Sequence, residues 1–219
     1  AIDPIGQGER LQYFDPEQGK SRIGGPVAEH SYAGMQFLPA GRTMAGVRVW
    51  DAVRTLDYLA GRPDVDMTRV GVHGRSGGGT LSAYVGALDD RIAAAAPECY
   101  ITSFQRLFQS IGPQDAEQNL LAQIASGLDH GDFFLARAPK PTLVVTTTRD
   151  MFSIQGARET VESVRPAFAA LGAEKNFGMI EDDAPHQSTK RNRERVYSFF
   201  MEHLKVNGSP LDEEIPAID

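Results

Sequence analysis

The chain has 219 residues, of which 41% are hydrophobic and 23% charged, as is ordinary for a globular protein. The net charge of −7 argues against a nucleic-acid partner, and no apolar run approaches the roughly 20 residues that span a bilayer. The single cysteine, Cys99, excludes an internal disulfide and a multi-cysteine zinc site. We expect no metal or other cofactor, because no histidine pair has ligand spacing on one helix.

Strand-like and helix-like segments alternate, which predicts an α/β fold with a mostly parallel sheet and helices on both faces. The stretch 4–40 is rich in glycine and proline and is expected to be a long loop. We expect a catalytic domain over 1–207, with an insertion over 100–136, and a loose tail over 208–219. In chain order, the predicted elements are a helix over 43–60, a strand over 69–73, a helix over 79–88, a strand over 92–96, a strand over 142–147, a helix over 154–171, a strand over 176–180 and a helix over 189–204.

The segment Gly74-Arg75-Ser76-Gly77-Gly78 matches G-x-S-x-G and lies between a predicted strand and a predicted helix. That is the setting of a nucleophile elbow, in which the serine occupies a strained turn. The residues two positions before and after the serine must be small, because strand and helix approach each other closely there, and Gly74 and Gly78 meet that requirement. Ser76 is therefore the candidate nucleophile, and the N–H of Gly77 is a candidate oxyanion donor. The alternative is a glycine-rich turn with an incidental serine.

A serine nucleophile needs a base, usually a histidine that a carboxylate orients. Three histidines follow Ser76: His130 lies in the insertion, His203 inside the closing helix, and His186 in the loop between the last strand and the last helix. An open parallel sheet places its active site at the carboxyl ends of its strands. We therefore predict that His186 is the general base.

The carboxylate should follow a strand between the serine and the histidine. Asp150 comes directly after the strand over 142–147 and is the first choice, and Glu98 after the strand over 92–96 is the alternative. Asp182 and Asp183 are expected to cap the loop before the histidine. Cys99 is interpreted as a small buried core residue rather than a nucleophile.

Substrate contacts are expected from Arg75 inside the elbow and from the insertion, which would shape the leaving-group side of the site. The insertion offers Tyr100, Phe104, Phe108 and Gln114 as possible contacts. The basic run over 190–195 is interpreted as a solvated helix face.

The order Ser76, Asp150, His186 resembles the α/β-hydrolase superfamily. More narrowly, the chain resembles the acetyl xylan esterase-like carbohydrate esterases and their prolyl oligopeptidase-like relatives. The stretch Asp3-Pro4-Ile5-Gly6-Gln7-Gly8-Glu9 is similar to the D-x-x-G-x-G-x that follows the fourth strand in those enzymes. The stretch Leu56-Asp57-Tyr58-Leu59-Ala60-Gly61-Arg62-Pro63-Asp64-Val65-Asp66 resembles their lead into the elbow.

The resemblance implies a serine esterase that removes a small acyl or alkyl ester from a carbohydrate through an acyl-enzyme. It also implies a periplasmic or secreted location. A prolyl oligopeptidase-like peptidase and an inactive hydrolase-fold binding module are the alternatives. The family has about three strands and a helix before the Asp3 stretch, including the loop with the second oxyanion donor. We therefore expect an N-terminal segment that is missing from this sequence or belongs to a complementary chain; the oligomeric state is not predicted.

Overall fold

A computed structural model describes residues 2–112 and 114–206. Its contacts divide the chain into two compact units. Unit 1 comprises Ala1–Val65 and Pro113–Gly127, and unit 2 comprises Asp66–Gly112 and Leu128–Asp219. Within the described residues, no helix combines the length and the apolar character needed to cross a membrane. The tail predicted over 208–219 lies outside the described residues.

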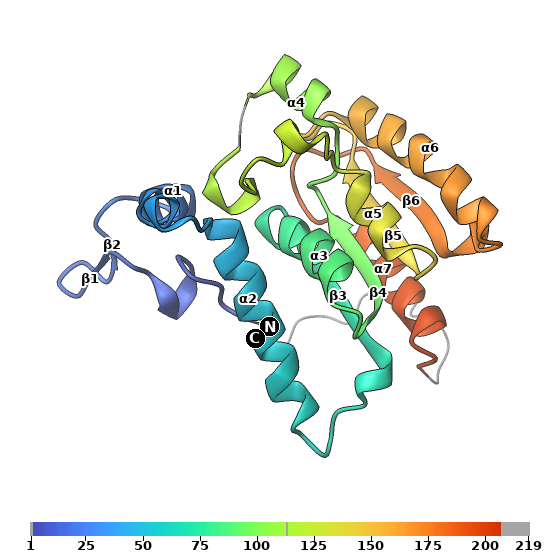
Figure 1. The fold of residues 1–219 in the computed structure, drawn as a ribbon, viewed down its shortest axis with the longest axis horizontal. Coiled ribbons are helices and arrows are strands. Elements are labelled where there is room, and N and C mark those ends of the chain that lie inside the picture. Colours follow the sequence, from blue (N-terminus) through green and yellow to red (C-terminus); the bar gives the residue numbers. More distant parts are fainter. Residues whose placement is uncertain (1, 113, 207–219) are drawn as a thin grey trace. The chain divides into compact units, whose positions relative to one another are not determined.

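Unit 2 contains a four-stranded parallel sheet, which confirms the predicted α/β architecture (Figure 1). The strand order is β3-β4-β5-β6, so that β3 and β6 are its outer strands. The β-branched run that predicts β5 is almost entirely buried, as expected for a strand covered on both faces. The bounds are Val70–Arg75 for β3, Ile92–Glu98 for β4, Thr142–Thr147 for β5 and Phe177–Asp182 for β6.

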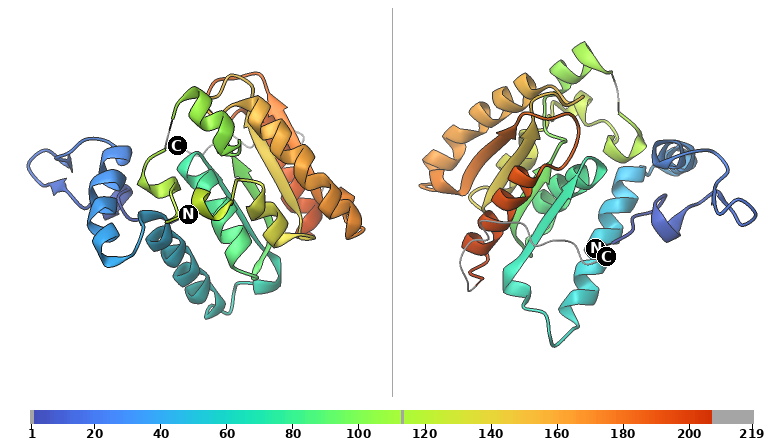
Figure 2. Two further views of the ribbon diagram at one scale, coloured as in Figure 1. Left: turned by 45° about the horizontal axis from the view of Figure 1, so that its top comes forward. Right: turned by 180° about the vertical axis from the view of Figure 1, so that it is seen from behind.

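Helices cover both faces of this sheet (Figure 2). A Cβ on Gly86 of α3 would lie 3.2 Å from Ala95 Cβ, whereas the next residue of β4, Ala96, packs with Val196 of α7. Since neighbouring strand residues point to opposite faces, α3 and α7 cover opposite sides. The helices of unit 2 are α3 (Gly77–Leu88), α4 (Phe104–Ser110), α5 (Asp132–Arg137), α6 (Ile154–Ala170) and α7 (Lys190–His203).

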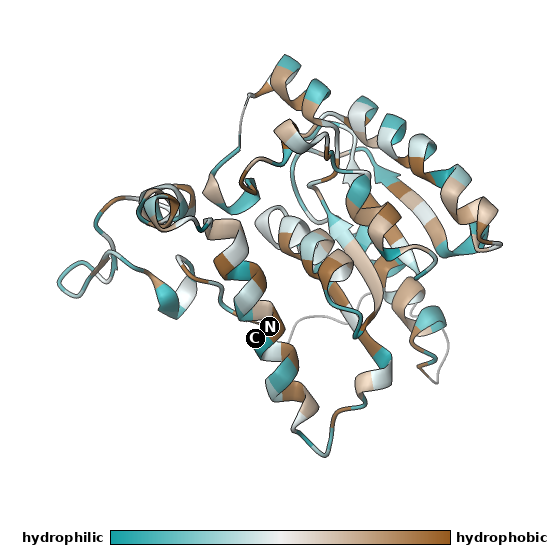
Figure 3. Ribbon diagram, viewed as in Figure 1, coloured by the Kyte–Doolittle hydropathy of each residue, from teal (hydrophilic) through white to brown (hydrophobic). Residues whose placement is uncertain are grey.

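Local sequence signals explain where the long helices begin. The hydroxyl of Ser153 accepts the N–H of Gly156 at the start of α6, and that of Thr189 accepts the N–H of Asn192 at the start of α7. Hydrophobic and hydrophilic residues form alternating bands along α6, as in an amphipathic helix with one face toward the sheet (Figure 3).

The strand register brings the carboxyl ends of all four strands to one edge of the sheet. Arg75 lies opposite Glu98, which lies opposite Val145, and Thr147 lies opposite Asp182. The elbow and the loops that follow the other three strands therefore emerge together at this edge, where open parallel sheets bind their ligands.

Unit 1 corrects the prediction of a long loop over 4–40, because that stretch contains the helix α1 (Pro26–Phe37). The buried face of α1 consists of Glu29, His30, Ala33 and Gly34. That face is mostly polar or small, so the apolar period that reveals a helix in a sequence is absent. The other elements of unit 1 are α2 (Met44–Ala60), a hairpin of β1 (Phe14–Asp15) and β2 (Lys20–Ser21), and 3-10 turns at Gly8–Arg10, Leu38–Ala40, Ala116–Gln118 and Ile124–Ser126.

A buried carboxylate organises the N-terminal part of unit 1. Glu29 is fully buried and accepts hydrogen bonds from the backbone N–H groups of Gln12 and Tyr13, at 2.8 and 3.2 Å, and from the hydroxyl of Ser21. These bonds compensate for the loss of water around the carboxylate and tie the hairpin to α1.

Candidate active site

The turn between β3 and α3 has the conformation of a nucleophile elbow. Ser76 has φ 58° and ψ −119°, a backbone conformation that non-glycine residues rarely adopt. Its N–H donates to the carbonyl of Glu98 at 2.9 Å, which anchors the turn to β4. Strain of this kind is often found at functional sites, where the surrounding structure maintains it.

Of the two motif glycines around Ser76, Gly74 has the role that the motif suggests and Gly78 does not. A Cβ on Gly74 would lie 2.6 Å from the carbonyl oxygen of Gly78, so the close approach of strand and helix is real. A Cβ on Gly78 would meet nothing within 4 Å, whereas one on Gly79 would lie 2.3 Å from the carbonyl oxygen of Glu98. The requirement for a small residue on the helix side thus falls on Gly79, which corrects the expectation for Gly78.

His186 and Asp150 form a hydrogen-bonded pair at the same edge of the sheet. His186 Nδ1 lies 2.8 Å from Asp150 Oδ1 and 3.0 Å from Oδ2, and the imidazole is partly exposed while the carboxylate is buried. A carboxylate only accepts, so Nδ1 carries the proton and Nε2 is left as an acceptor. This is the arrangement that prepares an imidazole to act as a general base.

Asp150 is held by two further donors. Its Oδ1 accepts the backbone N–H of Phe152 at 3.0 Å, and its Oδ2 accepts the hydroxyl of Thr147 at 3.1 Å. Burial is the largest single influence on the pKa of Asp150 and raises it, but the hydrogen bonds and charge of His186 and the N–H of Phe152 outweigh it and hold the pKa below its usual value. Sequence reasoning missed Thr147, because β5 also contains Thr142 and Thr146 and nothing local distinguishes the one that bonds Asp150.

Two arginines connect the histidine loop to its surroundings. Arg75, directly before the nucleophile, donates from Nη1 to the backbone carbonyl of His186 at 3.3 Å, and Arg193 of α7 donates to the carbonyl of Ser188 at 2.7 Å. The first contact places the elbow beside the histidine. It also gives Arg75, which we predicted to bind substrate, a role in supporting the loop.

The rival acid, Glu98, is the last residue of β4. Its side chain is 1% exposed, and its carboxylate oxygens have no hydrogen-bond partner among the described residues. The nearest histidine atom recorded is His73 Nε2, 3.7 Å from Oε2. Burial raises the pKa of Glu98 above its usual value, against the opposing electrostatic effects of His73, Arg75 and Arg193. The contact with His186 recorded in this structure is made by Asp150 rather than by Glu98.

The N–H that we predicted as an oxyanion donor, that of Gly77, lies at the N-terminus of α3. The helix begins at Gly77, directly after the nucleophile, so the Gly77 N–H belongs to its first turn. The first N–H groups of a helix have no partner within the helix, and its dipole favours negative charge there. Both properties suit the developing oxyanion of an acyl-transfer reaction.

The predicted substrate contacts of the insertion lie in different surroundings. Tyr100 is 1% exposed, its hydroxyl pairs with that of Tyr84 at 3.1 Å, and its ring stacks on His130, so it belongs to the core of unit 2. Its burial corrects the expectation of a substrate contact. Gln114 lies in unit 1, where its carbonyl accepts from Asn119 at 2.8 Å. Phe104 is buried and Phe108 is half exposed.

The other titratable candidates have structural roles. His130 is buried, which lowers its pKa to about 4, and its Nδ1 accepts the N–H of Thr102. His203 packs its ring against Phe199 within α7. Cys99 is buried, which raises the pKa of its thiol to about 12, so a thiolate nucleophile is disfavoured. Asp183 accepts from the side chains of Thr148 and Arg149, as expected for a residue that fixes the loop.

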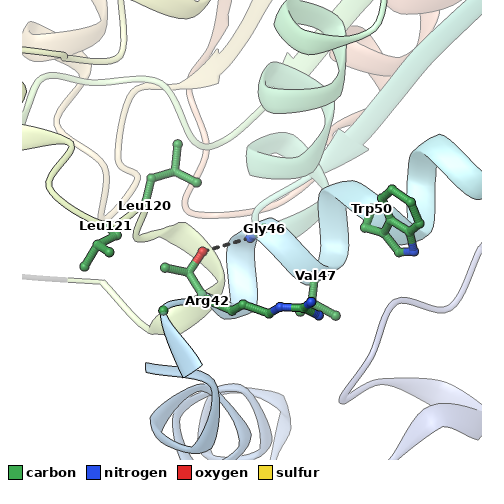
Figure 4. Close-up of a pocket in the computed structure, with 8 residues that line it drawn as sticks. Arg42, Gly46, Val47, Trp50, Leu120 and Leu121 are labelled. Atoms are coloured by element: carbon green, nitrogen blue, oxygen red, sulfur yellow. Dashed lines mark hydrogen bonds between the residues drawn. The ribbon is translucent and has the colours of Figure 1, made fainter. Parts of the chain in front are cut away.

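A separate concavity of about 660 Å³ lies in unit 1 (Figure 4). Arg42, Val47 and the half-exposed Trp50 lie on one side of it, and Leu120 and Leu121 on the other. Thr43 also lines the concavity, and its hydroxyl accepts the N–H of Gly46 as the N-cap of α2. The lining therefore offers a surface for contact and no nucleophile–base pair.

Unit 1 also contains a buried cluster of His30, Asp115 and Glu117, whose potential ligand atoms lie within 4.8 Å of one another. Arg48 lies among them: it pairs with Glu117, and its Nη1 lies 3.1 Å from His30 Nε2. Because the guanidinium only donates, Nε2 accepts and Nδ1 carries the proton toward Asp115, 3.4 Å away. The cluster is thus a hydrogen-bond network around a buried arginine, whose pKa burial lowers to about 10.

Comparisons with known proteins agree with the α/β architecture. The family model of acetyl xylan esterase (AXE1) matches residues 47–122, which include the elbow. The chain resembles a solved structure titled "Methylesterase BT1017" with a TM-score of 0.73 and 25% identity, over 96% of this chain and 42% of that one. The chain has an α/β-hydrolase fold. The α/β-hydrolase core is also shared with a carbohydrate esterase family 15 glucuronoyl esterase from Caldicellulosiruptor kristjansonii, at a TM-score of 0.63 and 18% identity, over 81% of this chain and 55% of that one.

A curated relative extends the resemblance. The protein named "Putative hydrolase YtaP" from Bacillus subtilis (strain 168) is 24% identical over 174 residues, which are 77% of this chain and 57% of that protein. The predicted resemblance of this α/β-hydrolase chain to carbohydrate esterases is therefore confirmed. The chain spans about half the length of the relatives that it matches.

Proposed function

We propose that this chain is the catalytic part of a serine esterase whose triad is Ser76, His186 and Asp150. The observation that carries the proposal is the His186–Asp150 hydrogen bond, on a loop that Arg75 joins to the strained elbow. The esterase names among the relatives support the reaction class. Fold alone does not determine function, so the proposal rests on the site.

The mechanism follows from the groups at the strand ends. His186 Nε2 removes the proton of the Ser76 hydroxyl as the oxygen attacks the ester carbonyl, and Asp150 stabilises the imidazolium that forms. The N–H of Gly77 donates to the oxyanion of the tetrahedral intermediate. The imidazolium then protonates the leaving alcohol, which gives an acyl-enzyme. A water molecule, deprotonated by the same imidazole, releases the acid and restores the serine.

We propose an ester-bearing carbohydrate as the substrate. Support comes from the acetyl xylan esterase model and from the glucuronoyl esterase structure, whose names refer to esters of sugars.

The decisive experiment compares the parent chain with Ser76→Ala in p-nitrophenyl acetate hydrolysis and in labelling by a fluorophosphonate, which reacts with activated serines. Ser163→Ala is the matched control, because the Ser163 hydroxyl donates to the Thr160 carbonyl within α6, away from the strand ends. We expect Ser76→Ala to lose both signals at an unchanged melting temperature, and Ser163→Ala to keep them.

The other outcomes separate the alternatives. Hydrolysis that survives Ser76→Ala would refute the nucleophile assignment. A folded parent chain that neither labels nor hydrolyses esters would favour the inactive binding module. Cleavage of proline-containing peptides without ester hydrolysis would favour the peptidase.

A further inference from the structure

A groove of about 500 Å³ runs along the outer strand β6, between that strand and α7. It lies wholly within unit 2. Lys175 and His203 line its part near the start of β6 and the end of α7, and Arg191 and Arg195 line its part near the start of α7. Since β6 ends and α7 begins on either side of the His186 loop, the groove extends toward the proposed active-site edge.

The groove is cationic on a chain of net charge −7. Among the described residues that line it, Glu202 is the only carboxylate. Neither Lys175 nor Arg195 has a carboxylate at ion-pair distance within the described part of the chain. Arg191 is 69% exposed and lies 3.8 Å from Asp182, the outer limit of an ion pair. The positive groups of Lys175, Arg191 and Arg195 are therefore available to an external anion.

Cationic residues at the start of α7 are unfavourable for the stability of that helix. The first turn of α7 contains no acidic residue, and Lys190 and Arg191 are its first two residues. The N-terminal end of a helix dipole is positive, so cations there are unfavourable. Lys190 and Arg191 are 60% and 69% exposed, as in the solvated face that the sequence suggested for this run. An anionic ligand would offset the repulsion.

The remaining lining suits a sugar chain. Asn176 and Ser198 offer amide and hydroxyl groups, and Phe199 offers part of an aromatic ring. We propose that this groove binds an anionic polysaccharide through its uronate carboxylates and guides the polymer toward Ser76. The inference rests on the proposed function for the role of guidance, whereas the binding itself is independent of catalysis.

The test measures retardation of the chain in native gels that contain polygalacturonate, neutral xylan or no polymer. The variant is Arg191→Gln with Arg195→Gln. The control is Arg62→Gln with Arg165→Gln, which removes the same charge from arginines paired with Asp64 and Glu162 outside the groove. We expect the parent and the control to be retarded by polygalacturonate only, and the groove variant to bind about threefold to tenfold more weakly.

Further outcomes separate this inference from the proposed function. Ser76→Ala should keep polygalacturonate binding, and the groove variant should keep p-nitrophenyl acetate hydrolysis. Absence of retardation in the parent, or an equal loss in the control variant, would overturn the groove as the binding site. Equal affinity of the parent for a duplex DNA probe would overturn the choice of a uronate polymer and favour a nucleic acid. Loss of ester hydrolysis with intact polymer binding would count against the catalytic proposal alone.

Discussion

Gly78 and Gly79 are neighbours in the first turn of α3, yet alanine should have opposite effects at the two positions. At Gly78 the new methyl group meets nothing within 4 Å, so Gly78→Ala should gain the helix propensity difference of about 1 kcal/mol. At Gly79 it would lie 2.3 Å from the carbonyl oxygen of Glu98, which also accepts the N–H of Ser76. Relief of that overlap requires a backbone shift.

The magnitude follows from these contacts. Overpacking typically costs about 1–3 kcal/mol, and loss of the Ser76 hydrogen bond about 1 kcal/mol more, against the same propensity gain. Gly79→Ala should therefore destabilise the chain by about 1–3 kcal/mol, which separates the two variants by about 2–4 kcal/mol. For a chain of this size the melting temperatures should differ by at least about 4 °C in thermal unfolding followed by circular dichroism. Equal melting temperatures would refute the packing argument.

Three further predictions concern the strand ends. Asp150→Asn should lower kcat for an aryl ester by about 10⁴-fold, because an amide in contact with Nδ1 favours the wrong tautomer, whereas Glu98→Gln should cost less than about tenfold; the reverse order would make Glu98 the acid. Glu98→Gln should also raise the free energy of unfolding at neutral pH. Because the pKa of Glu98 is raised in the folded chain, its ionisation lowers stability as pH rises from the unfolded pKa of about 4.3 toward the folded pKa. Denaturant titrations should therefore show the gain at neutral pH and none below about pH 4. Cys99 should resist Ellman's reagent at about pH 8 in the native state and react once unfolded, and rapid native labelling would contradict its burial.

The sequence predicted the elements that rely on apolar patterning. Strand β5 is a β-branched run with matching ends, and α6 has both its cap at Ser153 and an apolar face. Chain order and strand ends were enough to nominate Asp150 and His186, because parallel strands bring their carboxyl ends together. That inference needs only the order of elements and no knowledge of side-chain contacts.

The features that were missed depend on contacts between distant residues. Helix α1 turns Glu29 and His30 inward, and only their partners in other segments make that burial possible. The closeness of Gly79 to the Glu98 carbonyl arises from the packing of α3 on β4. Likewise, the burial of Tyr100 follows from its stacking on His130, thirty positions later in the chain. No local pattern encodes these three facts.

The proposed nucleophile and its base come from opposite margins of the sheet, since Ser76 follows β3 and His186 follows β6. With strands about 4.8 Å apart, three intervals separate those margins by about 14 Å. The histidine loop must therefore reach back across β5 and β4, and the Arg75 contact to the His186 carbonyl is made across that span. A molecule with any one of the four strands unformed cannot assemble the pair. Labelling of Ser76, if it reacts as proposed, would therefore count only the molecules in which all four strands have formed.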